Sequence, residues 1–148
     1  MNEVVEYLSG TASEVQIIEH LSCCDANFVP PLSGRIDIND YAKKIAGKAM
    51  RFEAWSGGTL VGLVAAYCND HEKRIAYITS VSVLKAWTGK GIAVQLMNYC
   101  IEHSKMLGMR EIVLEVAQDN RPAIRLYERS GFVAGNMNPP FITMNLYL

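Results

Sequence analysis

The chain has 148 residues, which is the length of one ordinary domain and enough to bury a single hydrophobic core. Half of the residues are hydrophobic and 20% are charged, a composition that excludes a disordered or fibrous chain. Fourteen Lys and Arg against fifteen Asp and Glu leave a net charge of −1, so the charge does not predict a nucleic-acid-binding protein, whose mark is a basic face. We therefore expect one globular domain over residues 1–148.

The chain carries no signal for a membrane or for secretion. No apolar stretch approaches the roughly 20 residues of a membrane span, and the first residues lack the basic and apolar segments of a signal peptide. We expect a cytoplasmic protein that does not bind membranes. Its four cysteines form no Cys-x-x-Cys pair, so they are expected to be reduced apolar residues, and no metal site is predicted.

The first half of the chain predicts one strand, two helices and then an antiparallel meander. Residues 4–8 are apolar and β-branched, which is typical of a strand. The stretch from Thr11 to Glu14 has the pattern of a capping box, and it predicts a helix that ends near Cys24. Asp37 is expected to cap a second helix that Gly47 ends. The strands of the meander are predicted at residues 50–55, 59–69 and 75–84.

Beyond the meander the hydrophobic pattern changes from the period of a strand to that of a helix. Gly89 and Gly91 precede a predicted helix with a continuous apolar stripe. Asn120 is expected to cap a shorter helix, which Gly131 stops. The order of elements, β-α-α-β-β-β-α-β-α-β-β, predicts a mixed α/β domain. Its last strands are expected at residues 111–116, 132–134 and 142–148.

The glycine-rich turn before the third helix is the first candidate for chemistry. Glycines beside a helix start let backbone amides approach an anion closely, and the helix dipole adds partial positive charge there. Lys85 and Lys90 can add full charges. These residues predict a phosphate or pyrophosphate site, although the turn lacks the Gly-Lys-Ser/Thr ending of a Walker loop. An ordinary tight turn is the alternative.

The strand and helix between residues 114 and 132 are the second candidate. Tyr127 lies two turns into the helix, and a phenol with a pKa near 10 can donate a proton to an anionic leaving group. Glu115 lies within a β-branched strand, an unusual place for a carboxylate unless it faces a cleft. The alternatives are an aromatic residue at the edge of the core and the solvent face of an edge strand.

Together the two passages resemble the GNAT superfamily of N-acetyltransferases. The acetyl-CoA signature of that family, Gln/Arg-x-x-Gly-x-Gly/Ala, is matched at residues 88–93 except that Thr88 stands where the family usually has Arg or Gln. A second family pattern is Asn-x-x-Ala-x-x-x-Tyr-x-x-x-Gly-Phe. It is matched without a gap by Asn120, Ala123, Tyr127, Gly131 and Phe132.

The resemblance implies both a fold and a co-substrate. The implied fold is a mixed, mostly antiparallel sheet of six to seven strands, flanked by about four helices and split between the fourth and fifth strands. Acetyl-CoA would lie in that split, and no metal is implied. The residues that the resemblance implies for binding acetyl-CoA are Val81, Val83, Thr88, Gly89, Lys90, Gly91, Ile92, Ala93, Asn120 and Tyr127.

The implied reaction is direct transfer of the acetyl group to a primary amine. Tyr127 would act as the general acid that protonates the departing CoA thiolate. Glu115 precedes Tyr127 by the same interval as the proposed base of the ribosomal-protein alanine acetyltransferases, which makes it a candidate base. The competing account is a water relay through Thr79, Ser80 or Ser82.

The acceptor amine is expected opposite CoA, between the first two helices and the C-terminal strands. Few carboxylates lie in these segments, which argues against a polycation and favours a small amine with an apolar or sugar portion, or a peptide N-terminus. A homodimer is left open. The implied acceptor contacts are Phe28, Tyr41, Tyr67 and Ser80, with Pro30, Pro31, Trp55 and residues 136–141 as further candidate lining.

Two other functions compete with an acetyltransferase. The replacement at Thr88 favours a non-catalytic acyl-CoA-binding sensor or subunit. A nucleotide-phosphate enzyme could use the turn at residues 89–91, although it would leave the pattern from Asn120 to Phe132 unexplained.

Overall fold

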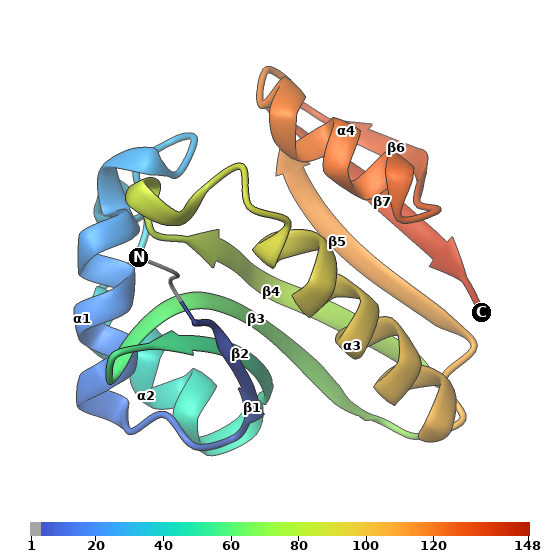
Figure 1. Ribbon diagram of the computed structural model, residues 1–148. Coiled ribbons are helices and arrows are strands. Elements are labelled where there is room, and N and C mark those ends of the chain that lie inside the picture. The colour runs from blue at the N-terminus through green and yellow to red at the C-terminus, as the bar shows by residue number, and fades with distance from the viewer. Residues whose placement is uncertain (1–3) are drawn as a thin grey trace.

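A seven-stranded sheet organises the protein in the computed structural model, which describes residues 4–148 (Figure 1). The strands lie in the order β1-β2-β3-β4-β5-β7-β6, and β4–β5 is the parallel pair among the described strands. The strands are β1 (Glu6–Ser9), β2 (Met50–Ser56), β3 (Thr59–Asp70), β4 (Ile75–Val83), β5 (Glu111–Ala117), β6 (Val133–Asn138) and β7 (Phe141–Tyr147). The α-helices are α1 (Glu14–Cys24), α2 (Ile38–Lys48), α3 (Ile92–Met106) and α4 (Arg121–Arg129). The predicted mixed α/β architecture and element order are confirmed.

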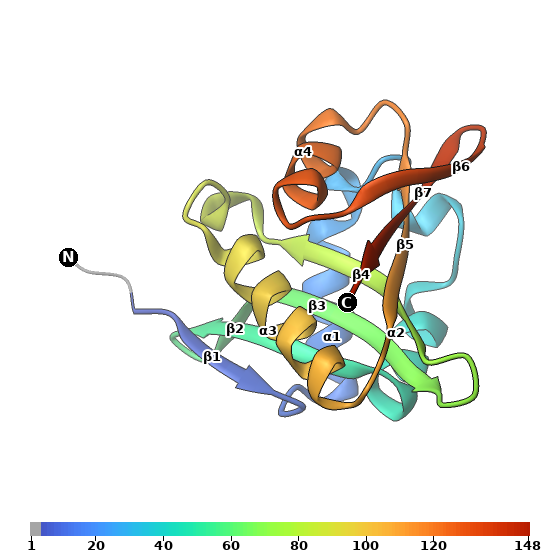
Figure 2. The ribbon, with the colours of Figure 1, turned by 90° about the vertical axis from the view of Figure 1, so that its right-hand side faces the viewer.

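Helices cover both faces of the sheet and enclose two apolar clusters. Figure 2 shows α3 in front of the central strands, with α1 and α2 behind them. One cluster joins the sheet to α3 and α4, and it includes Leu96, Met97 and Tyr127. The other joins the opposite face to α1 and α2, and it includes Ile17 and Ile45.

The sheet is split where β4 and β5 stop pairing. Their parallel register runs from Ile75 opposite Glu111 to Ile78 opposite Leu114 and ends there, although both strands continue. The next residue of β4, Thr79, is an extra residue in the β3–β4 ladder, since Ala65 and Ala66 of β3 pair with the residues on either side of it. Such a bulge bends a strand, so it lies where the split opens. The split predicted between the fourth and fifth strands is therefore confirmed.

The start of α1 differs from the prediction. Ser13, not Thr11, is the N-cap, and it forms a capping box with Gln16. Thr11 instead donates its backbone amide and its hydroxyl to a carboxylate oxygen of Glu53, at 3.0 and 2.7 Å. Both Thr11–Glu14 and Ser13–Gln16 fit the sequence pattern of a capping box. Because Thr11 is bound to the buried Glu53, Ser13 is the residue that caps the helix.

Two further element boundaries also differ from the prediction. Helix α2 continues through Gly47 to Lys48, since the amide of Ala49 still donates to Ile45 at 3.0 Å. Strand β6 continues to Asn138, beyond the predicted end at residue 134, because it pairs with β7.

Candidate functional site

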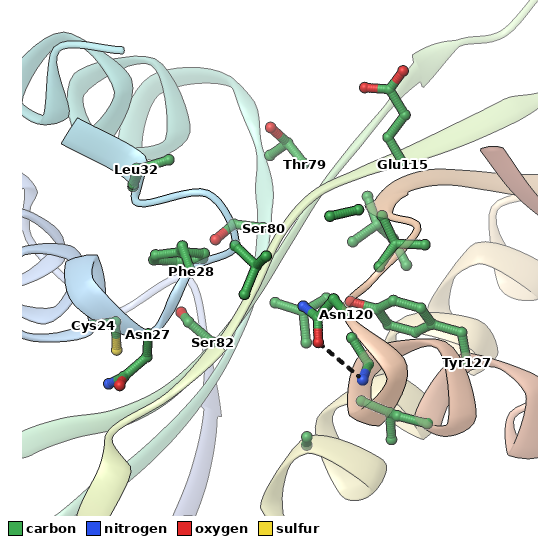
Figure 3. A pocket seen from close by; sticks show the side chains of 18 of the residues that line it. Cys24, Asn27, Phe28, Leu32, Thr79, Ser80, Ser82, Glu115, Asn120 and Tyr127 are labelled. Carbon is green, nitrogen blue, oxygen red and sulfur yellow. Dashed lines mark hydrogen bonds between the residues drawn. The ribbon is translucent and has the colours of Figure 1, made fainter. Parts of the chain in front are cut away.

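A pocket of about 350 Å³ opens at the split between β4 and β5 (Figure 3). Segments far apart in the sequence meet there: the end of α1 and the loop after it, the second half of β4, the end of β5, and α4. Its polar or aromatic lining includes Asn27, Phe28, Arg35, Tyr41, Tyr77, Thr79, Ser80, Ser82, Thr88, Glu115, Asn120, Tyr127 and Phe141.

A groove of about 670 Å³ adjoins this pocket on the side of α3 and α4. It is lined by the glycine-rich turn, the first turn of α3 and one side of α4. The groove and the pocket share lining residues, so they form a continuous path from the turn to the split. The shared residues are Val83, Thr88, Ala93, Asn120, Ala123 and Leu126.

The turn before α3 is built to expose backbone amides. Gly89 and Gly91 have φ of +76° and +79°, the left-handed region that favours glycine, and a Cβ at either position would meet nothing within 4 Å. Gly91 is the N-cap of α3, and the first amides of a helix have no partner within it. Thr88 closes the preceding turn, because its hydroxyl donates to the Lys85 carbonyl at 2.8 Å. The Lys90 Nζ lies 6.0 Å from the centroid of the Trp87 ring.

Tyr127 reaches the pocket from the other side of the split. It is 7% exposed and packs against the Phe132 ring at a centroid distance of 6.0 Å. Burial raises its pKa to about 12, so the phenol keeps its proton at neutral pH. Asn120 caps α4 by accepting from the Ala123 amide at 3.4 Å, which fixes the helix that carries Tyr127.

The two faces of β4 point towards different helices. Val81 and Val83 pack towards the cluster that includes α3 and α4. Ser80 and Ser82 therefore point the other way, towards α1, as alternation along a strand requires (Figure 3). The Ser80 hydroxyl is buried and has no hydrogen-bond partner among the described residues, whereas the Ser82 hydroxyl lies 2.8 Å from His20 Nε2.

The α1–α2 side of the pocket is held by Tyr41. Its hydroxyl donates to the Thr79 carbonyl at 2.5 Å and lies 2.7 Å from the Thr79 hydroxyl. Burial raises the Tyr41 pKa to about 12 in spite of that contact, which keeps the phenol protonated. The hydrogen bond ties α2 to the bulge of β4.

Charged side chains lie at the far end of the pocket. Glu115 is exposed there, and its carboxylate points away from Tyr127 (Figure 3). Arg35 lies with its guanidinium 5.6 Å from the centroid of the Phe141 ring. The end of the pocket away from the glycine-rich turn is thus the polar one.

Most of the residues that the sequence suggested lie along this path. Tyr67 does not line the pocket, and its hydroxyl is buried without a partner among the described residues. Trp55 lies instead in the apolar cluster beneath α1 and α2, with its indole nitrogen 3.2 Å from a Glu53 oxygen. Of the proline loop, Val29 and Leu32 line the pocket in place of Pro30 and Pro31, and of residues 136–141 only Phe141 does.

Several lining residues were not suggested by the sequence. Asn27 ends one short 3-10 helix between α1 and α2 and Arg35 follows another, and no sequence pattern there marks a side chain that faces a pocket. Tyr77 had a usable signal, since it lies two positions before Thr79 and alternation puts both on one face of β4.

Residues 4–148 contain neither a cluster of metal ligands nor a helix that could span a membrane. No group of three His, Cys, Asp or Glu side chains there could hold a metal ion. No helix in that range is both long and apolar enough to span a bilayer.

Comparison with known families identifies the family to which the chain belongs. The model of the acetyltransferase (GNAT) family matches residues 15–132, which is most of the chain. The chain belongs to the GNAT family. Acetyl-CoA is the acyl donor of this family. The open left-handed turn and the unpartnered amides of α3 fit its pyrophosphate, and the groove beyond them leads to the split.

Similar proteins differ in what their names say they acetylate. The chain is 34% identical over 83 residues to N-alpha-acetyltransferase MAK3 of Arabidopsis thaliana, covering 55% of the chain and 44% of that protein. It is 31% identical over 78 residues to mycothiol acetyltransferase of Corynebacterium glutamicum, covering 53% and 26%. The match therefore spans less than half the length of these two relatives.

A solved structure has the same fold. PaiA N-acetyltransferase of Thermoplasma acidophilum, solved in complex with coenzyme A, aligns with a TM-score of 0.76 over the whole of both chains at 16% identity.

Proposed function

We propose that the protein transfers the acetyl group of acetyl-CoA to a primary amine on a small molecule or a peptide N-terminus. The observation that carries this proposal is the continuous path from the glycine-rich turn to the split, with the protonated phenol of Tyr127 at the split. A long, thin donor with a phosphate at one end and a reactive group at the other matches that path.

The donor would be held mainly by backbone groups. Beyond Ile78 the edge of β4 that faces β5 no longer pairs with it, so the backbone around Val81 and Val83 can bind the amides of the pantetheine arm as an added strand would. The amides of residues 88–93 would bind the pyrophosphate. Because these donors are backbone groups, Thr88 in place of Arg or Gln removes one side-chain contact and leaves the rest of the site.

The chemistry follows from where the groups lie. The neutral amine attacks the carbonyl carbon of the thioester, a C–N bond forms, and the C–S bond breaks. A backbone amide of β4 near the split would polarise the thioester carbonyl. The departing thiolate takes the proton of Tyr127, and the phenolate recovers a proton from the nitrogen of the adduct.

The acceptor would approach from the α1–α2 side. Ser80 presents a buried hydroxyl that has no hydrogen-bond partner within residues 4–148 and that an amine can satisfy, and Phe28 and Tyr41 supply apolar contacts. Glu115, at the polar end, attracts an ammonium ion, and either its carboxylate or a relay through the hydroxyls of β4 removes the proton of that ion. The names of these two relatives include a protein N-terminus and a small molecule, mycothiol, so the acceptor panel needs both peptides and small amines.

The test is release of free CoA thiol from acetyl-CoA in the presence of amines. The panel holds amino sugars, aromatic and aliphatic monoamines, polyamines, and peptides with free or blocked N-termini. We expect turnover with a monoamine or a free peptide N-terminus and none with the blocked peptide. Tight binding of acetyl-CoA without transfer to any amine would contradict the proposal and establish the acyl-CoA-binding sensor instead.

A further inference from the structure

A buried histidine is joined to the pocket by a serine. His20, on α1, is 3% exposed and contacts the sheet through both ring nitrogens. Its Nδ1 lies 2.8 Å from the Leu60 carbonyl oxygen, and its Nε2 lies 2.8 Å from the Ser82 hydroxyl. No sequence motif includes His20, and the reaction proposed above does not use it.

These two contacts fix the tautomer of His20. A carbonyl oxygen can only accept, so Nδ1 carries the proton and donates it to Leu60. Nε2 of the neutral ring is then an acceptor, and Ser82 donates its hydroxyl proton to it. The lone pairs of the Ser82 oxygen remain available to the pocket that Ser82 lines.

His20 also lines a second cavity. A space of about 170 Å³ is lined by His20 together with Gln16, Glu19 and Cys23 of the same helix, of which Glu19 and Cys23 are exposed. His20 therefore stands between the pocket, through Ser82, and a cavity with exposed lining. This cavity shares no lining residue with the path of the acyl donor, and its exposed lining places His20 next to solvent.

We propose that Ser82 and His20 form the path by which the acceptor ammonium loses its proton before it attacks. This inference rests on the proposed function. The ammonium gives one proton to Ser82 Oγ while the proton of Ser82 passes to His20 Nε2, and the neutral amine then forms the C–N bond. The second N–H proton reaches the CoA thiolate by way of Tyr127. His20 returns its proton to solvent, so one proton is released for each acetyl group transferred.

The surroundings of His20 suit a proton acceptor. Burial lowers the pKa of the ring, so it is neutral and ready to accept at pH 7, while the Leu60 carbonyl favours the charged form once it is made. Among described residues, the titratable groups on its own helix are Cys24, at 3.8 Å, and Glu19 and Cys23 in the outer cavity. Burial raises the pKa of the Cys24 thiol to about 11, so it stays uncharged. From β3 and β4 the ring meets only Leu60 and Ser82 as polar partners.

The test uses Ser82→Ala and His20→Asn in the full chain. The Asn side chain can keep the donor to Leu60 but has no basic nitrogen. General-base assistance contributes on the order of 10²–10⁴-fold, so we expect kcat for an alkylammonium acceptor to fall by roughly 10² in both variants. The KM for acetyl-CoA should not change. The acid limb of the wild-type pH profile of kcat/KM should disappear in both.

A matched acceptor separates this role from a structural one. An analogue whose nitrogen is already neutral at pH 7, such as a hydrazide, needs no proton removed before it attacks, so both variants should acetylate it at close to the wild-type rate. Glu115→Gln is compared in parallel and should keep the acid limb.

The opposite pattern overturns the proposal: a wild-type kcat in Ser82→Ala, equal losses with both acceptors, or loss of the acid limb in Glu115→Gln alone. If His20→Asn does not fold, Ser82→Ala still decides. Failure of the wild-type chain to acetylate any amine is a different result, and it overturns the proposed function itself.

Discussion

Tyr127 combines the two properties that an acid for a thiolate needs. It keeps its proton at neutral pH, because burial raises its pKa to about 12, and it lines the pocket at the split. Phe132 and the capped start of α4 hold the ring in place, so the hydroxyl can be removed without moving the helix.

We therefore predict that Tyr127→Phe separates catalysis from binding. Loss of a general acid should lower kcat by about 10²–10⁴-fold, whereas the dissociation constant for acetyl-CoA should change little. Steady-state thiol release gives kcat, and isothermal calorimetry gives the dissociation constant. A variant with wild-type kcat would remove Tyr127 from the mechanism.

The burial of His20 also predicts how the stability of the fold depends on pH, and this prediction can be tested without measuring turnover. The pKa of His20 is lowered from 6.5 in the folded protein by burial, so between the folded value and 6.5 the unfolded chain binds more protons. The stability due to neutral His20 is complete above about pH 6.5 and is lost as the pH falls through the folded pKa. We expect the free energy of unfolding, from urea titrations, to decline as the pH falls below 6.5. His20→Asn should flatten that decline, and an equal slope in both proteins would contradict the neutral buried ring.

The residues that could not be predicted from the sequence have one feature in common: their partners are distant in the chain. His20 binds partners 40 and 62 positions away, and Glu53 binds Thr11 and Ala12 across more than 40 positions. No local pattern marks such pairs. Tyr127 and the glycines could be predicted because their roles depend on neighbours within one turn or one helix.

At the scale of elements, the start of α1 depends on a charge buried beneath it. Glu53 is fully buried and accepts bonds from Thr11, Ala12, Arg51 and Trp55. Burial raises its pKa, but the bonds from Thr11, Ala12 and Trp55 outweigh that effect, so the pKa lies below its ordinary value. The carboxylate thus joins β2 to the helix that forms the acceptor side of the pocket.

Replacing Glu53 by Gln should be strongly destabilising. It removes one partner of a buried ion pair and turns an amide nitrogen towards N–H donors, which costs about 3–5 kcal/mol. The matched control is Glu102→Gln, since Glu102 forms an exposed pair with Lys105 at 3.6 Å and exposed pairs contribute roughly 0–1 kcal/mol. Urea unfolding of both variants measures the difference. Equal, small losses would mean that the Glu53 network does not hold α1.

The glycine-rich turn permits a similar matched comparison. Gly91 and Gly58 have the same φ of +79° and open space where a Cβ would lie, but Gly58 is in the β2–β3 turn, far from the groove. Alanine at either position should cost about 1–2 kcal/mol of stability, because L residues are strained there. Only Gly91→Ala should weaken the binding of acetyl-CoA, with a dissociation constant higher by on the order of 10-fold, since the substitution shifts the amides that bind pyrophosphate. An unchanged dissociation constant in Gly91→Ala would place the pyrophosphate elsewhere.

The types of the helices and strands were predicted well from the hydrophobic period, and their ends were predicted less well. The alternation of β4 and the apolar stripe of α3 gave the correct types and order. Gly47 looked like a helix end, but a glycine ends a helix only when the chain turns left-handed there, and α2 continues through it. In the segment between α1 and α2, Phe28 was predicted to line the pocket, but Asn27, Val29, Leu32 and Arg35 were not. A loop with two prolines has no hydrophobic period from which to predict the side chains that face inward.

At the scale of the molecule, the split divides the sheet into two parts that share only a short parallel ladder. The strands β1 to β4 lie on one side with α1 and α2, and β5, β7 and β6 lie on the other with α4 (Figure 1). The path for the donor crosses between them, lined by β4 and α3 on one side and by α4 on the other. A ligand in that path adds contacts where the ladder has ended.

Acetyl-CoA should therefore stabilise the whole fold and do so more than ATP. A ligand that binds only the folded state adds about 2.7 kcal/mol at 100 times its dissociation constant, which is roughly 8 °C in melting temperature for a chain of this size. ATP offers phosphates to the turn but has no pantetheine arm to follow β4, so its shift should be much smaller at equal concentration. Hydrogen exchange should show acetyl-CoA protecting the start of α3 and the start of α4 together, because the donor contacts both sides of the split. An ATP shift as large as that of acetyl-CoA, with protection confined to the turn, would instead support a nucleotide-phosphate site, and the role proposed for the split would fail with it.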